Sequence, residues 1–419
     1  MIDSNEHLFR REAGRMVATL ARIFGVHNLA LAEDVVQDAF CRALEVWKFA
    51  GVPENPAAWL MATAKHRALD VLRRERTART FAPELGRLLE SEWTVAPIVE
   101  EFFGATAIKD DQLRMMFSCC HPQLAEEAQV ALVLNILCGF SVNEIANAFV
   151  SGNAAIEKRL SRAKKVLAGS KTLFDLAGAG DFSGRLPAVH RALYLLFNEG
   201  YHGASPESAV RTELCREAMR LTVLLLEHPL AAIPPTYALA ALMYLHAARL
   251  PARIDAAGNL SSWFNQDRSQ WDLELIAEGE RLLNLSAAGS ALTEYHLEAA
   301  IAAVHTISRR SEDTDWKKII SLYDTLMTLR PSPVVALNRA IAVAQHEGPE
   351  RGLEEIHAIA DQKRLATYPF YHAALAEFEC HSGRHEIARE HFRAALAVAR
   401  NAMERRFLED RLASCKRDT

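Results

Sequence analysis

Apolar residues recur along this chain at helical spacing, most clearly between Glu126 and Lys171. The first part of this stretch, Ala128 to Leu137, is apolar and predicts a helix. Ser141 follows, and Glu144 stands three residues later, which is the spacing of a capping box. The pattern therefore predicts a second, short helix that begins directly after Ser141 and ends near Val150.

The break Ser151-Gly152-Asn153 separates this short helix from a third predicted helix, Ala154 to Leu167, with Asn153 as its N-cap. Spacing i, i+4, i+7, i+11 gives it one apolar stripe, formed by Ile156, Leu160, Ala163 and Leu167. From Ser141 to Lys171, six Lys/Arg stand against two Glu, a local charge of 6 − 2 = +4. A short helix, a turn and a basic helix are typical of major-groove reading. An ordinary helical hairpin with a solvated basic face fits the same pattern.

Three further helices are predicted near the N-terminus, over Arg10 to Phe24, Leu31 to Trp47 and Pro56 to Arg76. The buried face of the second should consist of Val36, Ala39, Phe40, Ala43 and Trp47. Its opposite face places Asp34 and Asp38 four residues apart, a like-charge pair. This face is either solvated or made for a basic protein partner.

The third of these helices carries Trp59 on its polar side and ends in Arg73-Arg74-Glu75-Arg76. An aromatic ring beside cations is typical of surfaces that bind unstacked bases. The alternative is that Trp59 packs on a neighbouring helix. The pattern at this helix leaves both open.

The bulk composition limits the function classes. The chain has 419 residues, 50% of them hydrophobic, and a net charge of −5, so any nucleic-acid binding must come from local patches. Its seven scattered cysteines indicate free thiols in a reducing cytoplasm. No apolar run has the length of a membrane span, and strand-like alternation is nearly absent. We therefore expect an all-α, cytoplasmic protein of more than one domain.

Three segments follow one another in a fixed order: AEDVVQDAFCRALEVW, NPAAWLMATAKHRALDVLRRER and DDQLRMMFSCCHPQLAEEAQVALVLNILCGFSVNEIANAF. Together they resemble regions 2 and 4 of the extracytoplasmic-function (ECF) sigma factors, a compact group of bacterial sigma-70 class transcription initiation factors. LYLLFNEGYHG and DTDWKKIISLYDTLMTLRPSPVVALNRAIAVA are similar to the helical-repeat extension of one subgroup. The resemblance implies a region 2 helical bundle in residues 1–80, an acidic linker in 81–110, a region 4 helix-turn-helix in 111–170 and a tetratricopeptide-like regulatory domain in 171–419.

The resemblance also implies partners and contact residues. Core RNA polymerase, through its β′ coiled coil and β flap, and promoter DNA would be the partners. The residues expected to contact polymerase are Asp34, Gln37, Asp38 and Arg42. The −10 element would be read and opened by Trp59, Lys65, His66, Arg67, Asp70, Arg73 and Arg74. The −35 element would be contacted by Asn153, Lys158, Arg159, Ser161, Arg162 and Lys165. If four cations neutralise phosphates there, the log–log salt slope is about −3.6.

The linker is acidic. From Phe81 to Asp111, seven Asp/Glu stand against Arg87 and Lys109, a net charge of 2 − 7 = −5. A solvated tether has this composition. By resemblance, the linker would instead thread polymerase channels that normally hold nucleic acid.

The C-terminal half shows a weak repeat, in which Gly348 aligns with Gly383 at a period of 35 residues, close to the 34-residue tetratricopeptide unit. Stacked helix pairs form concave surfaces, so a protein or peptide partner is expected here. One polar cluster, formed by Asn198, Glu199, Tyr201 and His202, is read as a buried network rather than a ligand site. A second group resembles a feature of the family extension: Trp263, Gln266, Asp267, Arg268 and Trp271.

Nothing in the sequence has the spacing of a nucleophile, a phosphate loop or a metal site, so no enzyme, cofactor or metal is expected. Cys119-Cys120-His121 has no second ligand pair nearby and is read as core or surface. The main interpretation is a sigma factor. The rivals are a helix-turn-helix regulator that acts without polymerase, and a repeat scaffold with a decayed sigma portion.

Overall fold

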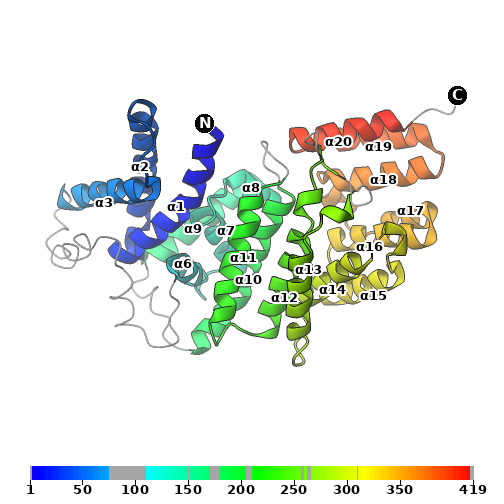
Figure 1. Cartoon of the computed structure of the whole chain (residues 1–419), viewed down its shortest axis with the longest axis horizontal. Helices are drawn as coiled ribbons and strands as arrows, with labels where there is room; N and C mark the ends of the chain where they lie inside the picture. Colours follow the sequence, from blue (N-terminus) through cyan, green and yellow to red (C-terminus); the bar gives the residue numbers. More distant parts are fainter. Residues whose placement is uncertain are drawn as a thin grey trace. The chain divides into compact units, whose positions relative to one another are not determined.

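The computed structural model describes residues 2–74, 110–149, 151–169, 179–203, 210–255, 259–261, 266–308 and 310–415 (Figure 1). This part is helical apart from turns, loops and one isolated bridge between Ile254 and Leu260, which confirms the all-α class. The chain divides into two compact units. Unit 1 comprises residues 1–193 and 228–231, and unit 2 comprises residues 194–227 and 232–419.

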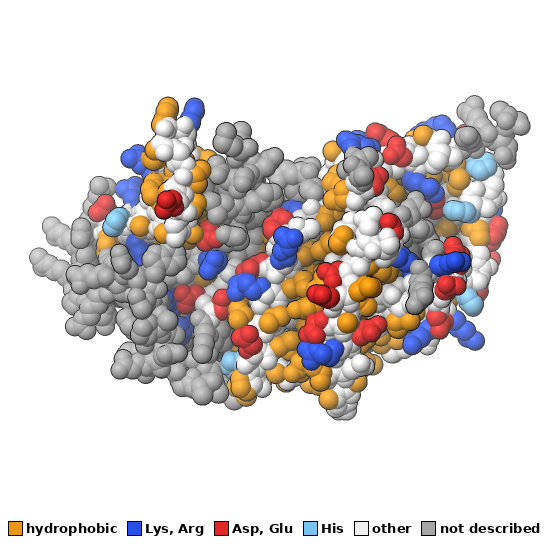
Figure 2. Space-filling view, viewed as in Figure 1, with side chains coloured by type: hydrophobic (Ala, Val, Ile, Leu, Met, Phe, Trp, Pro, Cys, Tyr) orange, Lys and Arg blue, Asp and Glu red, His pale blue; other side chains and the backbone are white. Residues whose placement is uncertain are grey.

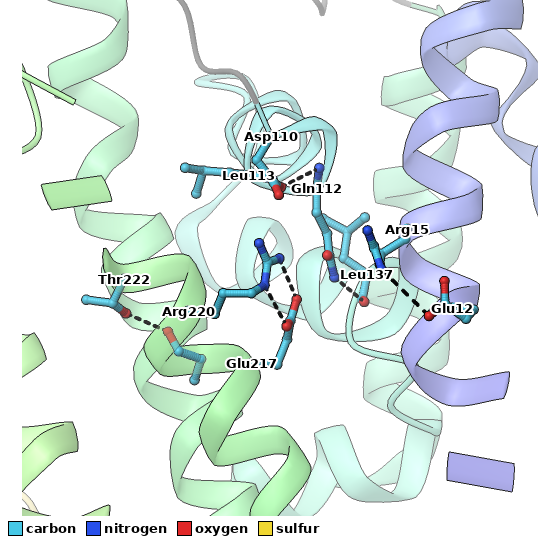
Figure 3. Close-up of polar contacts among 10 residues, drawn as sticks. Glu12, Arg15, Asp110, Gln112, Leu113, Leu137, Glu217, Arg220 and Thr222 are labelled. Atoms are coloured by element: carbon cyan, nitrogen blue, oxygen red, sulfur yellow. Dashed lines mark hydrogen bonds and ion pairs between the residues drawn. The ribbon is translucent and has the colours of Figure 1, made fainter. Parts of the chain in front are cut away.

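Unit 1 contains α1 (Ile2–Phe24), the 3-10 helix η1 (Val26–Asn28), α2 (Leu29–Ala50), α3 (Pro56–Arg74), α6 (Asp111–Cys119), α7 (Glu126–Ile136), α8 (Val142–Ala148), α9 (Asn153–Gly169) and the first part of α10 (Ala179–Tyr201). The N-terminal helices and the α6–α9 segment share one core. At Gly14 of α1, an added Cβ would lie 2.0 Å from the carbonyl oxygen of Leu137, so only glycine permits this approach. Gln112 of α6 donates to the same oxygen at 3.4 Å (Figure 3).

Local signals explain where several helices start. Ser141 and Glu144 form the predicted capping box of α8. Asn55 caps α3, since its Oδ1 accepts from the Ala58 amide at 3.0 Å. Asn153 differs from its prediction. The Gly152 carbonyl accepts the first bonds of α9, from Ala155 and Ile156, so Asn153 lies inside the first turn rather than before it.

The predicted acidic linker is residues 81–110, of which 81–109 lie outside the described part. Asp110 and the following Asp111 are structural. Asp110 is the N-cap of α6 and accepts from the Gln112 and Leu113 amides at 2.9 Å (Figure 3). Asp111 pairs with Arg22 of α1 at 3.0 Å. These two charges therefore hold α6 in unit 1 and do not belong to a solvated tether.

Unit 2 contains the end of α10, α11 (Thr212–Glu227), α12 (Pro234–Ala247), η2 (Leu250–Ala252), η4 (Arg268–Gln270), α13 (Leu273–Ser286), α14 (Glu294–Ile307), η5 (Ser311–Asp313), α15 (Trp316–Leu329), α16 (Pro333–Glu347), α17 (Pro349–His357), η6 (Gln362–Leu365), α18 (Pro369–His381), α19 (His385–Ala397) and α20 (Ala402–Ser414). Its core is a series of adjoining clusters. One cluster joins α12, α13 and α14, and the next joins α14, α15 and α16. A third joins α16, α17 and α18, and a fourth joins α18, α19 and α20. Each helix thus packs mainly on its sequence neighbours, as in repeat proteins.

The surface of unit 2 carries charges of both signs. On the face drawn in Figure 2, acidic and basic side chains alternate among apolar ones. Several are short-range helix pairs, such as Arg220 with Glu217 at 2.7 Å on α11 (Figure 3). Pairs of this kind add little stability, because they are exposed and solvent screens them.

Candidate nucleic-acid interface

Helix α2 presents the expected polar face. Its buried residues include Val36, Ala39, Ala43 and Trp47, while Phe40 is only half-buried. All four residues expected to contact polymerase are exposed: Asp34, Gln37, Asp38 and Arg42. The face of α2 opposite the core is therefore open to a partner protein.

Helix α3 packs beside α2 and turns a second polar face outward. Leu60, Ala64 and Ala68 are fully buried, whereas His66, Arg67 and Asp70 are exposed. The guanidinium of Arg67 donates to Asp38 at 2.8 Å, and this hydrogen bond raises the pKa of Arg67 above its ordinary value. The ion pair joins the face of α3 expected to meet DNA to the face of α2 expected to meet polymerase.

Two other residues of α3 lie less openly than their pattern suggested. Trp59 is half-buried, and its ring lies tilted against Trp47 with centroids 5.5 Å apart. The structure thus contains the packing that was the alternative for Trp59. Lys65 is half-buried, and burial, followed by the nearby Arg22, lowers its pKa. Arg73 and Arg74 end α3, but their side chains lie outside the described part.

Helix α9 has the predicted apolar stripe: Ile156, Leu160, Ala163 and Leu167 are all buried. The opposite face exposes Asn153, Lys158, Ser161, Arg162 and Lys165. Among the described residues, no ion pair involves Lys158, Arg162 or Lys165. Their spacing i, i+4, i+7 aligns three cations along one face, which is the arrangement that follows a phosphate backbone.

Arg159 and Lys164 differ from these three cations. Arg159 pairs with Glu127 of α7 at 2.7 Å and lies 5.6 Å from the ring centre of Phe149. Lys164 contacts both carboxylate oxygens of Glu33 in α2, at 2.7 and 3.0 Å. Sequence spacing alone could not separate them from the exposed cations, because their partners come from other helices. If α9 contacts DNA as expected, three cations rather than four remain for phosphates, and the expected salt slope becomes about −2.7.

Cysteine positions bear on metal binding. Cys119 and Cys120 are buried in α6 and just after it, and burial, followed by Glu33, raises the pKa of Cys119 to about 12.

A different group could hold a soft divalent cation: Cys380, His385 and Cys415, whose ligand atoms lie within 4.8 Å of one another. The two Sγ atoms are 3.0 Å apart. Sequence reasoning missed this group, because Cys415 follows 35 residues after Cys380 and only α18–α20 packing joins them.

None of the described helices is long and apolar enough to cross a lipid bilayer.

Residues 8–78 match the sigma-70 region 2 family, and residues 185–287 match a family of unknown function (DUF6596). An uncharacterized protein of Rhizobium meliloti (strain 1021) is 38% identical over 398 residues, which cover 94% of this chain and 92% of that protein. No solved structure matches the chain. The chain belongs to one family with the R. meliloti protein, and its region 2 supports a role as an RNA polymerase sigma factor of the sigma-70 class.

Proposed function

We propose that this sigma-70 class chain is an ECF-type sigma factor that recruits core RNA polymerase to a restricted set of promoters. The proposal rests on the exposed polar face of α2, within the region 2 match and directly beside α3. A protein that only bound DNA would have no use for an acidic face on the helix next to its basic one. This face is where the β′ coiled coil would dock. The place of action would be the cytoplasm.

Promoter contact would be divided between two helices. The exposed face of α3 would meet the −10 element, and the packed rings of Trp59 and Trp47 would support this face. Helix α9 would enter the −35 major groove, with α8 crossing the backbone and the β flap as its polymerase partner. Lys158, Arg162 and Lys165 would reach phosphates and guanine edges. Arg159 would mainly orient α9 through Glu127.

Both DNA-reading helices belong to one compact unit in this structure, through Lys164–Glu33 and Arg22–Asp111. Promoter elements about 20 base pairs apart are separated by roughly 70 Å of duplex, at 3.4 Å per base pair. A packed unit cannot place α3 and α9 that far apart. We infer that the packed form is the polymerase-free state and that docking on polymerase separates α3 from α9.

Unit 2 would regulate this activity in the same chain. Fusion keeps a regulator at high effective concentration beside its target. Its stacked helix pairs, which we interpret as tetratricopeptide-like, would provide a concave surface for a peptide or protein partner. Whether regulation activates or inhibits is what transcription by full-chain variants would decide.

Run-off transcription with bacterial core polymerase and a library of promoter fragments tests the proposal. The full chain should give specific transcripts, and the double substitution Asp34→Ala, Gln37→Ala should abolish them together with polymerase binding. Glu54→Ala changes an exposed acid just before α3 and serves as the matched control. Binding of the full chain to promoter DNA without binding to core polymerase would favour the helix-turn-helix regulator instead.

A further inference from the structure

Three segments that the proposed function does not use meet inside unit 2. The first is the end of α10, which supplies Tyr201, with His202 directly after it. The segment that starts with the last turn of α12 and continues through η2 supplies His246, Arg249 and Arg253. A third segment around η4 contributes Gln266, Arg268 and Trp271. The contacts among these eight residues, here called the arginine cluster, join all three segments.

Arg253 is the central residue of the arginine cluster. It is 7% exposed, its guanidinium lies 4.3 Å from the ring centre of Tyr201, and its Nη2 is 3.0 Å from Nδ1 of His202. Its Nε has no hydrogen-bond partner, and within the described residues no carboxylate pairs with it. A buried guanidinium without a counter-charge is costly, so the fold must gain something by keeping it.

Arg249 extends the same positive region. It is also 7% exposed, its Nε and Nη2 lie 3.4 and 3.3 Å from Oε1 of Gln266, and it stands 5.5 Å from the ring centre of Trp271. Arg268 lies 4.9 Å from the same ring centre. Burial, with Arg253 and Arg268 as neighbouring cations, lowers the pKa of Arg249 to about 10. Two guanidiniums, of Arg249 and Arg268, thus lie against one tryptophan ring.

Several buried polar atoms around these guanidiniums also lack a partner. They are the hydroxyl of Tyr201, Nδ1 of His246 and Nε2 of Gln266. Buried polar groups in folded proteins are almost always hydrogen-bonded, so these three atoms and Nε of Arg253, all on residues of the arginine cluster, are available to ligand oxygens. His202 is exposed, so the arginine cluster is accessible from solvent at this residue.

Neighbouring arginines show how this fold treats a structural guanidinium. Arg211, 4% exposed, pairs with Glu199 at 2.9 Å. Arg400 pairs with Glu404. Each of these two guanidiniums has its own carboxylate, and Arg253 does not. The difference separates a charge that holds the fold from a charge that is kept for something else.

We propose that the arginine cluster binds the oxyanion group of a small molecule, a phosphate or a carboxylate, with Arg253 and Arg249 as its charge partners and Tyr201, His202 and Gln266 as its hydrogen-bonding neighbours. Guanidinium forks match both anions in geometry. A small ligand fits better than an acidic protein surface, because both guanidiniums are almost fully buried. This site stands whether or not the chain acts as a sigma factor.

The test uses the full chain and two probes, inorganic phosphate and succinate, titrated by calorimetry at constant ionic strength with chloride as the reference anion. Arg253→Met should weaken binding by on the order of tenfold to a hundredfold. Arg281→Met removes an exposed arginine paired with Glu278 and should leave binding unchanged. Binding of phosphate alone or succinate alone identifies the anion. If neither probe binds the unaltered chain, or chloride competes equally, the proposal is wrong.

Thermal midpoints without added oxyanion provide a second readout that does not need the natural ligand. Arg253→Met should match or exceed the unaltered chain, because it removes an uncompensated charge. Arg211→Met should lower the midpoint, because it leaves Glu199 buried without its partner. If Arg253→Met lowers the midpoint as much as Arg211→Met does, Arg253 is a structural residue and the proposal fails.

Discussion

The two units place their basic side chains in opposite settings. On α9 of unit 1, Lys158, Arg162 and Lys165 are exposed and aligned on one face. In unit 2, Arg249 and Arg253 are each only 7% exposed. Exposed cations reach a long polyanion and lose affinity as salt screens them. Buried cations meet only an anion small enough to enter, but the field there is stronger. The depth of the charge, more than the number of charges, decides the size of the ligand.

The overall charge of −5 reveals neither the exposed cations of α9 nor the buried arginines of unit 2. In unit 1, the ion pairs Lys164–Glu33 and Arg159–Glu127 neutralise two cations of α9 and hold this helix to α2 and α7. In unit 2, the pairing of Arg211 with Glu199 does the same and leaves Arg253 unneutralised. Pairing therefore selects, in each unit, which cations remain for a ligand.

The largest effect on stability is expected in the core of unit 1, where α10 packs on α6. Phe182 of α10 stacks on Phe117 of α6 at 4.4 Å, and Phe117 is fully buried. Phe182→Ala should lower the free energy of unfolding of unit 1 by about 3–5 kcal/mol, through lost burial and the cavity that remains. Hydrogen exchange of the α6 amides measures it. Phe49→Ala, at a phenylalanine of α2 that is 87% exposed, is the control and should change nothing.

Acidification should destabilise unit 2 more than unit 1. Burial lowers the pKa of His246 and His305 in unit 2 to about 3, and that of His190 in unit 1 to about 4. These rings are neutral when folded, so the unfolded state binds more protons below its pKa of about 6.5, and stability falls as pH falls from 6.5 towards 4. Each ring should cost on the order of 1–2 kcal/mol at pH 5.

Burial also lowers the pKa of His202, His296 and His391 in unit 2, so unit 2 should unfold first. Far-UV circular dichroism combined with hydrogen exchange between pH 7 and pH 4.5 would follow each unit separately. Equal loss in both units, or earlier loss in unit 1, would contradict the prediction. His246→Asn should reduce the pH dependence of unit 2.

A moderate effect should distinguish the exposed cations from the paired ones on the same helix. Arg162→Ala should weaken promoter-fragment binding uniformly and make the log–log salt slope less negative by about 0.9. Lys164→Met removes a cation held by Glu33 and should leave the slope unchanged. Footprinting at several salt concentrations measures both. Equal slopes for the two variants would remove the division between exposed and paired cations.

The smallest effect concerns the exposed pair Arg67–Asp38. Both side chains are about half accessible, so the ion pair should add nothing measurable to thermal stability. Arg67→Ala should leave the thermal midpoint unchanged while lowering open-complex formation in transcription assays. A clear drop in the midpoint would mean that this pair holds α3 on α2 and serves no ligand.

Much of the fold could be read from local patterns. The apolar stripes of α2 and α9 came from spacing alone, because a helix repeats every 3.6 residues and its buried face must do the same. The capping box of α8 was visible because Ser141 and Glu144 are close in sequence. Asn153 was assigned one position wrongly, since glycine and asparagine at 152 and 153 can both start a helix and only backbone bonds decide between them.

The sequence by itself determined the helical class, the order of the helices and which face of each is apolar. Only the tertiary structure decided which side chains have partners inside the fold. Arg159 and Lys164 form ion pairs, and Asp110 and Asp111 hold α6. Trp59 packs against Trp47. It also decided that Arg253 meets Tyr201 and that Arg249 meets Gln266. The physical reason is range. Periodicity and capping act within a few residues, whereas pairing, burial and electrostatic potential depend on partners brought from distant helices.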